Sequence, residues 1–117
     1  PILDARRMEV YTALFDSKLN QIKDTEALIV DENSIQKFST QKQIYFFGNG
    51  MDKCRKILEA LPNARFISDI KPSAKFMIDL AEEKFKNSEF ENVASFEPFY
   101  LKDFMILNRK KVNSEIH

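Results

Sequence analysis

The fold class is decided by the stretch IYFFGNG, residues 44–50. A continuous apolar run that ends on a glycine is typical of a short strand buried on both faces. After the glycines, apolar residues recur from Cys54 to Leu61 at the i, i+3, i+4 and i+7 positions, and Pro62 follows. This spacing predicts an amphipathic helix that ends before the proline. The stretch therefore predicts one strand–helix unit of an α/β protein.

Further strands are expected on both sides of this unit. Residues that favour β structure predict strands at residues 2–3, 9–15, 27–30 and 65–67. Between the second and third of them, the polar residues 16–20 predict a hairpin turn. The chain therefore begins with a run of antiparallel strands.

Two further helices complete the pattern. The polar cluster at residues 31–34 starts a short helix, and Pro72 starts a longer one whose apolar stripe runs to Phe85. The resulting order, βββαβαβα, predicts a mixed sheet, antiparallel at one side and parallel at the other, with helices packed on it. This is the order of a ribonuclease H-like domain, the half-unit of the actin-like ATPase fold.

The length of 117 residues suits one domain with its own core. We expect a single ribonuclease H-like domain over residues 1–107 and a disordered tail over residues 108–117. Pro1 in place of an initiator Met suggests either a fragment of a longer protein or a processed chain. The apolar runs are too short for a signal peptide or a membrane span, and the one cysteine, Cys54, fits a reducing cytoplasm.

Charge and histidine content limit the chemistry. Lys plus Arg and Asp plus Glu number 18 each, so no net attraction to nucleic acid or membrane is built in. The one histidine is the last residue, His117, which excludes a histidine-based triad, zinc site or general base inside a formed pocket. Asp79, Glu82 and Glu83 share a polar helix face without forming an acid–base pair, and Cys54 is expected to be a buried, inert thiol. We expect no catalytic residue and no metal site.

The turn Gly48-Asn49-Gly50 has two interpretations. Its backbone N–H groups could hold a phosphate, with Asp4 near the phosphates or their metal, as in actin-like ATPases. However, two glycines are a small part of any phosphate-loop pattern, and a tight turn that needs positive φ explains them as well. The hairpin at residues 5–7 carries two arginines where those ATPases carry glycine. We therefore favour a tight turn, in which any phosphate site is vestigial and the Asp4 side chain bonds its own backbone.

The basic residues suggest two weaker contacts. Arg6 and Arg7 could bind an anion or a partner's carboxylate, or form ion pairs with Glu9 or Asp4. The basic run at residues 109–111 could touch RNA, although three charges on a tail are more often simply solvated.

The stretch EPFYL, residues 97–101, combines two aromatic residues with a proline and an acid. It could be an exposed docking strip anchored by Tyr100, because tyrosine and phenylalanine are common in interfaces. We favour the other interpretation, a terminal strand that pairs with the sheet and turns its aromatic side chains inward.

Two phrases near the ends of the chain carry a family resemblance. They are DARRMEVY, residues 4–11, and EPFYLKDF, residues 97–104. With the glycine turn and the helix start at residues 72–74, they resemble the second half of the TsaB (YeaZ) family of tRNA threonylcarbamoyladenosine synthesis. Lys102 stands where family members often carry arginine, and the N-terminal half of the family has no counterpart in this sequence.

The resemblance implies a non-catalytic scaffold in the cytoplasm. Its partners would be a TsaD-type subunit, which transfers the threonylcarbamoyl group to adenosine 37 of tRNA, and a TsaE-type ATPase. ATP and metal would lie on those partners, this chain would carry no cofactor, and it would meet tRNA only indirectly. A homodimer stays open, and no interface residue is carried over. The alternative is the nucleotide-binding half of an active actin-like ATPase or transferase, with Asp4 and Gly48 beside a phosphate.

Overall fold

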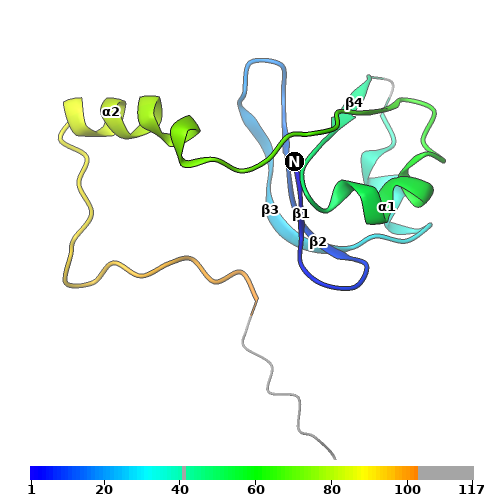
Figure 1. Cartoon of the computed structure of the whole chain (residues 1–117), viewed down its shortest axis with the longest axis horizontal. Coiled ribbons are helices and arrows are strands. Elements are labelled where there is room, and N and C mark those ends of the chain that lie inside the picture. Colours follow the sequence, from blue (N-terminus) through cyan, green and yellow to red (C-terminus); the bar gives the residue numbers. More distant parts are fainter. Residues whose placement is uncertain (41, 103–117) are drawn as a thin grey trace, which may run out of the picture.

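The computed structural model describes residues 1–40 and 42–102 (Figure 1). The strands are β1 (Ile2–Asp4), β2 (Glu9–Phe15), β3 (Gln21–Ile29), β4 (Ile44–Phe46) and β5 (Ala64–Phe66). The helices are the 3₁₀ helices η1 (Ser34–Phe38) and η2 (Ala74–Met77), and the α-helices α1 (Met51–Leu58) and α2 (Ile78–Lys86). The mixed α/β class is confirmed. Residues 103–117 lie outside the described residues, and with them the end of the expected domain, its tail and the basic run at 109–111.

The first three strands form an antiparallel sheet. Leu3 of β1 lies opposite Tyr11 of β2, and Tyr11 lies opposite Ala27 of β3. The predicted hairpin turn is present, because the Asp16 carboxylate accepts hydrogen bonds from the backbone N–H groups of Lys18 (2.8 Å) and Asn20 (2.9 Å). β3 begins six residues earlier than the sequence pattern predicts, since its first half is exposed and lacks an apolar signal.

The other two strands form a parallel pair, in which Ile44 lies opposite Ala64 and Phe46 opposite Phe66. The two sheets adjoin at Ile2. Its N–H donates to the carbonyl of Phe47 (2.7 Å), and its carbonyl accepts from the N–H of Gly50 (3.0 Å). The start of β1 therefore lies beside the end of β4 and the turn that follows it.

The core lies on one side of these strands, under α1 and η1. The Phe46 ring packs edge-on against Phe38 (centroids 5.4 Å apart) and stacks on Phe66 (5.9 Å). Cys54 and Leu58 of α1 are fully buried in the same core. The buried apolar cluster consists of Ile2, Val10, Leu28, Val30, Ile35, Phe38, Ile44, Phe46, Met51, Cys54, Leu58, Leu61 and Ala64.

The opposite side of the strands is not covered by the described residues. Side chains alternate along a strand, so the neighbours of the core residues point to this side. They include large apolar groups that are half or more exposed, such as Ile29 and Tyr45. We call this surface the open sheet face; its members are Leu3, Tyr11, Ile29, Tyr45 and Ile67.

Beyond β5 the chain leaves the sheets. All of residues 68–100, which we call the C-terminal arm, are exposed, including both faces of α2 (Figure 1). The predicted helix after Pro72 is present, but the prediction that it packs on the sheet is wrong. The favoured inward-facing terminal strand is also wrong, because residues 97–100 form no strand and the side chains of Phe99 and Tyr100 are 83% and 78% exposed. Apolar periodicity shows that a helix has a face to bury, but it does not say against what.

Candidate functional site

The candidate site is centred on Asp4, at the end of β1. Its backbone N–H donates to the Asn49 side-chain oxygen (2.9 Å), and its carboxylate accepts from the N–H of Arg6 (2.9 Å). The Lys53 ammonium forms an ion pair with the same carboxylate and also donates to the carbonyl of Glu9 (2.7 Å). Three separate segments therefore meet here: the β1–β2 turn, the glycine turn and the first turn of α1.

The glycines of the turn are required by the close approach of β1. Gly48 has a φ of +112°, and a Cβ there would lie 2.3 Å from the carbonyl oxygen of Ile2. A Cβ on Gly50 would lie 2.9 Å from the Ile2 side chain and 3.0 Å from the nitrogen of Asp4. The positive φ at Gly48 is what the tight-turn interpretation predicts. Contact with the neighbouring strand is enough to explain both glycines.

The Asp4 carboxylate at the centre of the site is paired with the Lys53 ammonium. The hydrogen bond from Lys53, followed by that from the Arg6 backbone, holds the pKa of the Asp4 carboxyl below its ordinary value. The carboxylate is therefore ionised at neutral pH, beside the turn where a phosphate would have to enter. The N–H of Gly50 is already bonded to Ile2. Within residues 1–40 and 42–102, no group of three or more His, Cys, Asp or Glu residues is placed to hold a metal.

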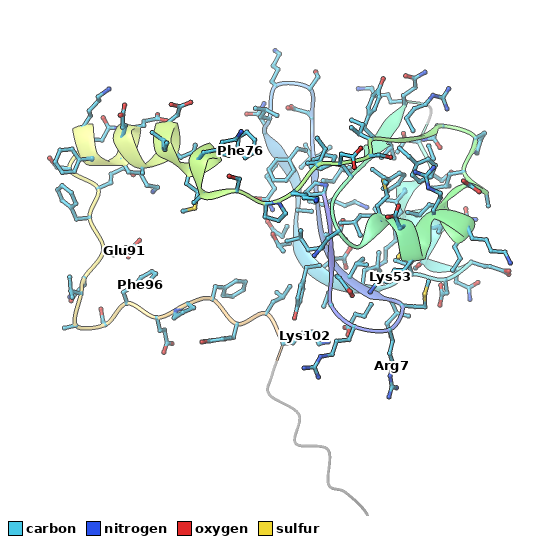
Figure 2. All side chains as sticks on the ribbon, in the orientation of Figure 1. Arg7, Lys53, Phe76, Glu91, Phe96 and Lys102 are labelled. Atoms are coloured by element: carbon cyan, nitrogen blue, oxygen red, sulfur yellow. The ribbon has the colours of Figure 1, made fainter. Side chains whose placement is uncertain are left out.

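Arg6 and Arg7 are positioned by the β1–β2 turn. Both have positive φ, 79° and 47°, and both side chains are exposed. Figure 2 shows the Arg7 side chain pointing away from the sheet. The turn is closed by backbone bonds between Ala5 and Glu9 (3.0 Å) and between Glu9 and Arg6 (2.9 Å). Neither arginine forms an ion pair with the described residues, so the interpretation as local ion pairs with Asp4 or Glu9 is wrong. Those carboxylates pair instead with Lys53 and Lys102.

Tyr100 is not part of this site. The phrase of the sequence that contains Tyr100 also contains Lys102, which lies at the site. Lys102, two residues further along, forms an ion pair with the half-buried Glu9 carboxylate (Figure 2). Because Glu9 belongs to the first phrase and Lys102 to the second, the two phrases of the sequence meet in space. Sequence reasoning missed Lys53 and Lys102 as partners. The family pattern draws attention to position 102, whereas nothing local marks Lys53.

The remaining candidates are not part of a site. Cys54 is fully buried, and burial raises the pKa of its thiol, as expected for an unreactive cysteine. Asp79, Glu82 and Glu83 are exposed on α2, as predicted, and Glu82 forms a surface ion pair with Lys86 (3.7 Å).

Comparisons with protein-family models, with curated proteins and with solved structures found no match for this chain. No helix among the described residues is long and apolar enough to cross a membrane.

Proposed function

We propose that this chain is the C-terminal, ribonuclease H-like half of a non-catalytic scaffold subunit in cytoplasmic tRNA threonylcarbamoyladenosine synthesis. The observation that carries the proposal is the contact between the two family-like phrases, in which Lys102 pairs with Glu9 across 93 positions of sequence. A motif whose separated parts meet on one surface is a better family marker than either part alone. The order of strands and helices along the chain supports the same family.

The site chemistry favours a scaffold over a catalyst. At Asp4, the carboxylate is held by Lys53, and the glycine turn is filled by the backbone of β1. The charged and hydrogen-bonding groups of the site are therefore paired with one another. Their contacts hold β1, the β1–β2 turn and α1 together. In this proposal, ATP and metal bind to a TsaD-type transferase and a TsaE-type ATPase, and tRNA contacts those partners rather than this chain.

Complex formation with a purified TsaD-type subunit tests the proposal. The chain is mixed with that subunit, alone and as part of the two-domain protein, and the mass is read by size-exclusion chromatography with light scattering. A complex with the two-domain protein is the expected result. A variant with Arg6→Glu and Arg7→Glu tests whether these exposed guanidinium groups contact the partner, with Lys18→Glu as the matched surface control. Absence of any complex with the two-domain protein overturns the proposal.

The alternative, a nucleotide-binding half of an active actin-like enzyme, has one observation in its favour: Lys53 lies in the first turn of the helix that follows the glycine turn. A lysine there could reach a phosphate if it left Asp4. Calorimetric titration with ATP and Mg²⁺ decides between the two. Micromolar binding that is lost in Lys53→Met supports the enzyme, and no heat of binding supports the scaffold.

A further inference from the structure

The glycine turn contains an asparagine followed directly by a glycine, Asn49-Gly50. An asparagine in this position is especially prone to spontaneous deamidation, because a following glycine has no side chain to hinder attack by its own backbone nitrogen. The two residues lie where β4 passes into α1, beside the start of β1 (Figure 1). The turn therefore contains a side chain that can react with the neighbouring backbone.

The reaction needs only the chain and water. The backbone nitrogen of Gly50 gives up its proton and attacks the side-chain carbon Cγ of Asn49. The side-chain nitrogen leaves as ammonia, and the new C–N bond closes a succinimide ring. Water then opens the ring at either of its two carbonyl groups. One product is aspartate, and the other is isoaspartate, in which the main chain passes through Cβ and Cγ and is one methylene longer.

In the folded chain, β1 holds both of the reacting groups. The N–H of Gly50, a buried residue, donates to the carbonyl of Ile2 (3.0 Å). The side-chain oxygen of Asn49 accepts from the N–H of Asp4 (2.9 Å). Ring closure removes the very proton that the Ile2 carbonyl accepts, so this hydrogen bond must be lost before the ring can form. The docked strand therefore slows the reaction.

The isoaspartate product does not fit the folded turn. A Cβ on either Gly48 or Gly50 would already collide with Ile2, so the turn has no room for an added main-chain atom. The turn is also fixed at both ends to one residue of β1: Ile2 donates to the carbonyl of Phe47 and accepts from the N–H of Gly50. An extra methylene between these two bonds changes their spacing. Aspartate keeps the normal main chain and an oxygen that can accept the hydrogen bond from β1.

We propose that Asn49 is a deamidation site, that the docking of β1 against the glycine turn protects it, and that isoaspartate formation makes loss of the fold permanent. A molecule that opens and closes again before it reacts is unchanged. A molecule that forms isoaspartate while open is unable to close again. The turn thus limits the lifetime of the folded chain by a slow chemical step that follows opening. The inference does not depend on the proposed function.

The first test compares the rate of deamidation at Asn49 with and without the fold. The whole 117-residue chain is incubated at neutral pH, and a synthetic peptide of residues 43–53 gives the rate in the absence of the fold. Digestion with pepsin at acid pH, where the reaction is slow, is followed by mass spectrometry. The chain is expected to react at least about 100-fold more slowly than the peptide, because only opened molecules react. Equal rates in the chain and the peptide overturn the proposal.

The second test changes how often the chain opens. Leu58→Ala removes a fully buried side chain of α1 and is expected to raise the rate at Asn49 about 30-fold or more, up to the rate of the peptide. Leu80→Ala in the exposed α2 is the matched control and should react like the wild type. Asn87, which precedes a serine in the C-terminal arm, is the internal reference and should react at one rate in all three chains. Urea below the unfolding midpoint should also raise the rate at Asn49 in the wild type. A rate that neither Leu58→Ala nor urea raises overturns the proposal.

The third test asks whether isoaspartate prevents folding. An aged sample is divided by size exclusion into folded and unfolded chains, and the two products are identified in each fraction against synthetic peptides. Isoaspartate is expected only in the unfolded fraction, and Asn49→Asp, which copies the aspartate product, is expected to be folded. Asn49→Ala is unable to form the ring and should show no such loss of fold with time. Isoaspartate in the folded fraction, or loss of fold in Asn49→Ala at the wild-type rate, contradicts the permanent loss that we propose.

Discussion

At the scale of single residues, the glycine turn shows how a motif that suggests ligand binding is explained by packing. The Ile2 carbonyl oxygen occupies the space that the Cβ of any side chain at position 48 would need. Loss of ATP binding in a Gly48 variant would therefore not identify a phosphate contact, because the variant disturbs the fold itself.

Gly48→Ala is expected to destabilise the chain by at least about 2 kcal/mol, since alanine is strained at this φ and its Cβ clashes with backbone. Asn49→Ala, which removes one exposed hydrogen bond to Asp4, is the matched control and is expected to cost about 1 kcal/mol or less. Urea unfolding followed by tyrosine fluorescence measures both. Equal stability of Gly48→Ala and the wild type would contradict the packing explanation.

Asp4 is expected to make stability depend on acid pH. Its folded-state pKa lies below the unfolded value of about 3.9, so it stabilises the fold above that value. That contribution is lost as the pH falls from about 4 through the folded-state pKa. In Lys53→Met the pKa of Asp4 should rise toward its ordinary value, as read by NMR titration of the carboxyl carbon. Asp16, whose pKa is lowered by hydrogen bonds from Asn20, should not move; if Asp4 does not move either, Lys53 is not the cause.

The residue-level errors of the sequence analysis have one physical origin. Asp4, Gly48, Asn49 and Gly50 do lie together, because the end of a strand and a strand–helix turn are predictable from local pattern. The partners of the carboxylates were wrong, because Arg6 and Arg7 were chosen by their nearness in sequence. Lys53 and Lys102 reach the same groups from 49 and 93 positions away, and only the tertiary fold brings them there.

At the scale of elements, hydrophobic periodicity and the glycine, proline and polar residues between elements predicted the strands and helices of residues 2–86 to within a few residues, except for the start of β3. The terminal strand that we favoured at residues 97–101 is absent from the described residues. What they could not predict was where an apolar helix face goes. α1 and α2 both carry an apolar stripe, yet α1 buries Cys54 and Leu58 while α2 buries nothing in the described chain. A single helix cannot show which surface will cover it.

The contrast between the two helices can be measured. Leu58→Ala in α1 removes a fully buried side chain and is expected to lower the free energy of unfolding by about 2–5 kcal/mol. Leu80→Ala in α2 removes a side chain that is 64% exposed and is expected to change it by less than about 0.5 kcal/mol in dilute, monomeric protein. A large loss for Leu80→Ala under those conditions would mean that α2 packs within its own chain.

At the scale of the whole molecule, residues 2–66 contain the core, and residues 68–100 bury nothing against it. Amide hydrogen exchange should report this difference between the two parts. The amides of α1 and of the core strands are expected to exchange slowly, because they open only when the core opens, and those of α2 are expected to exchange rapidly. Phe85→Asp changes an exposed side chain of α2 and is expected to leave this pattern as it is in the wild type. Slow exchange of the α2 amides in the wild type, lost in Phe85→Asp, would contradict this expectation and would show that the apolar stripe of α2 is covered in solution.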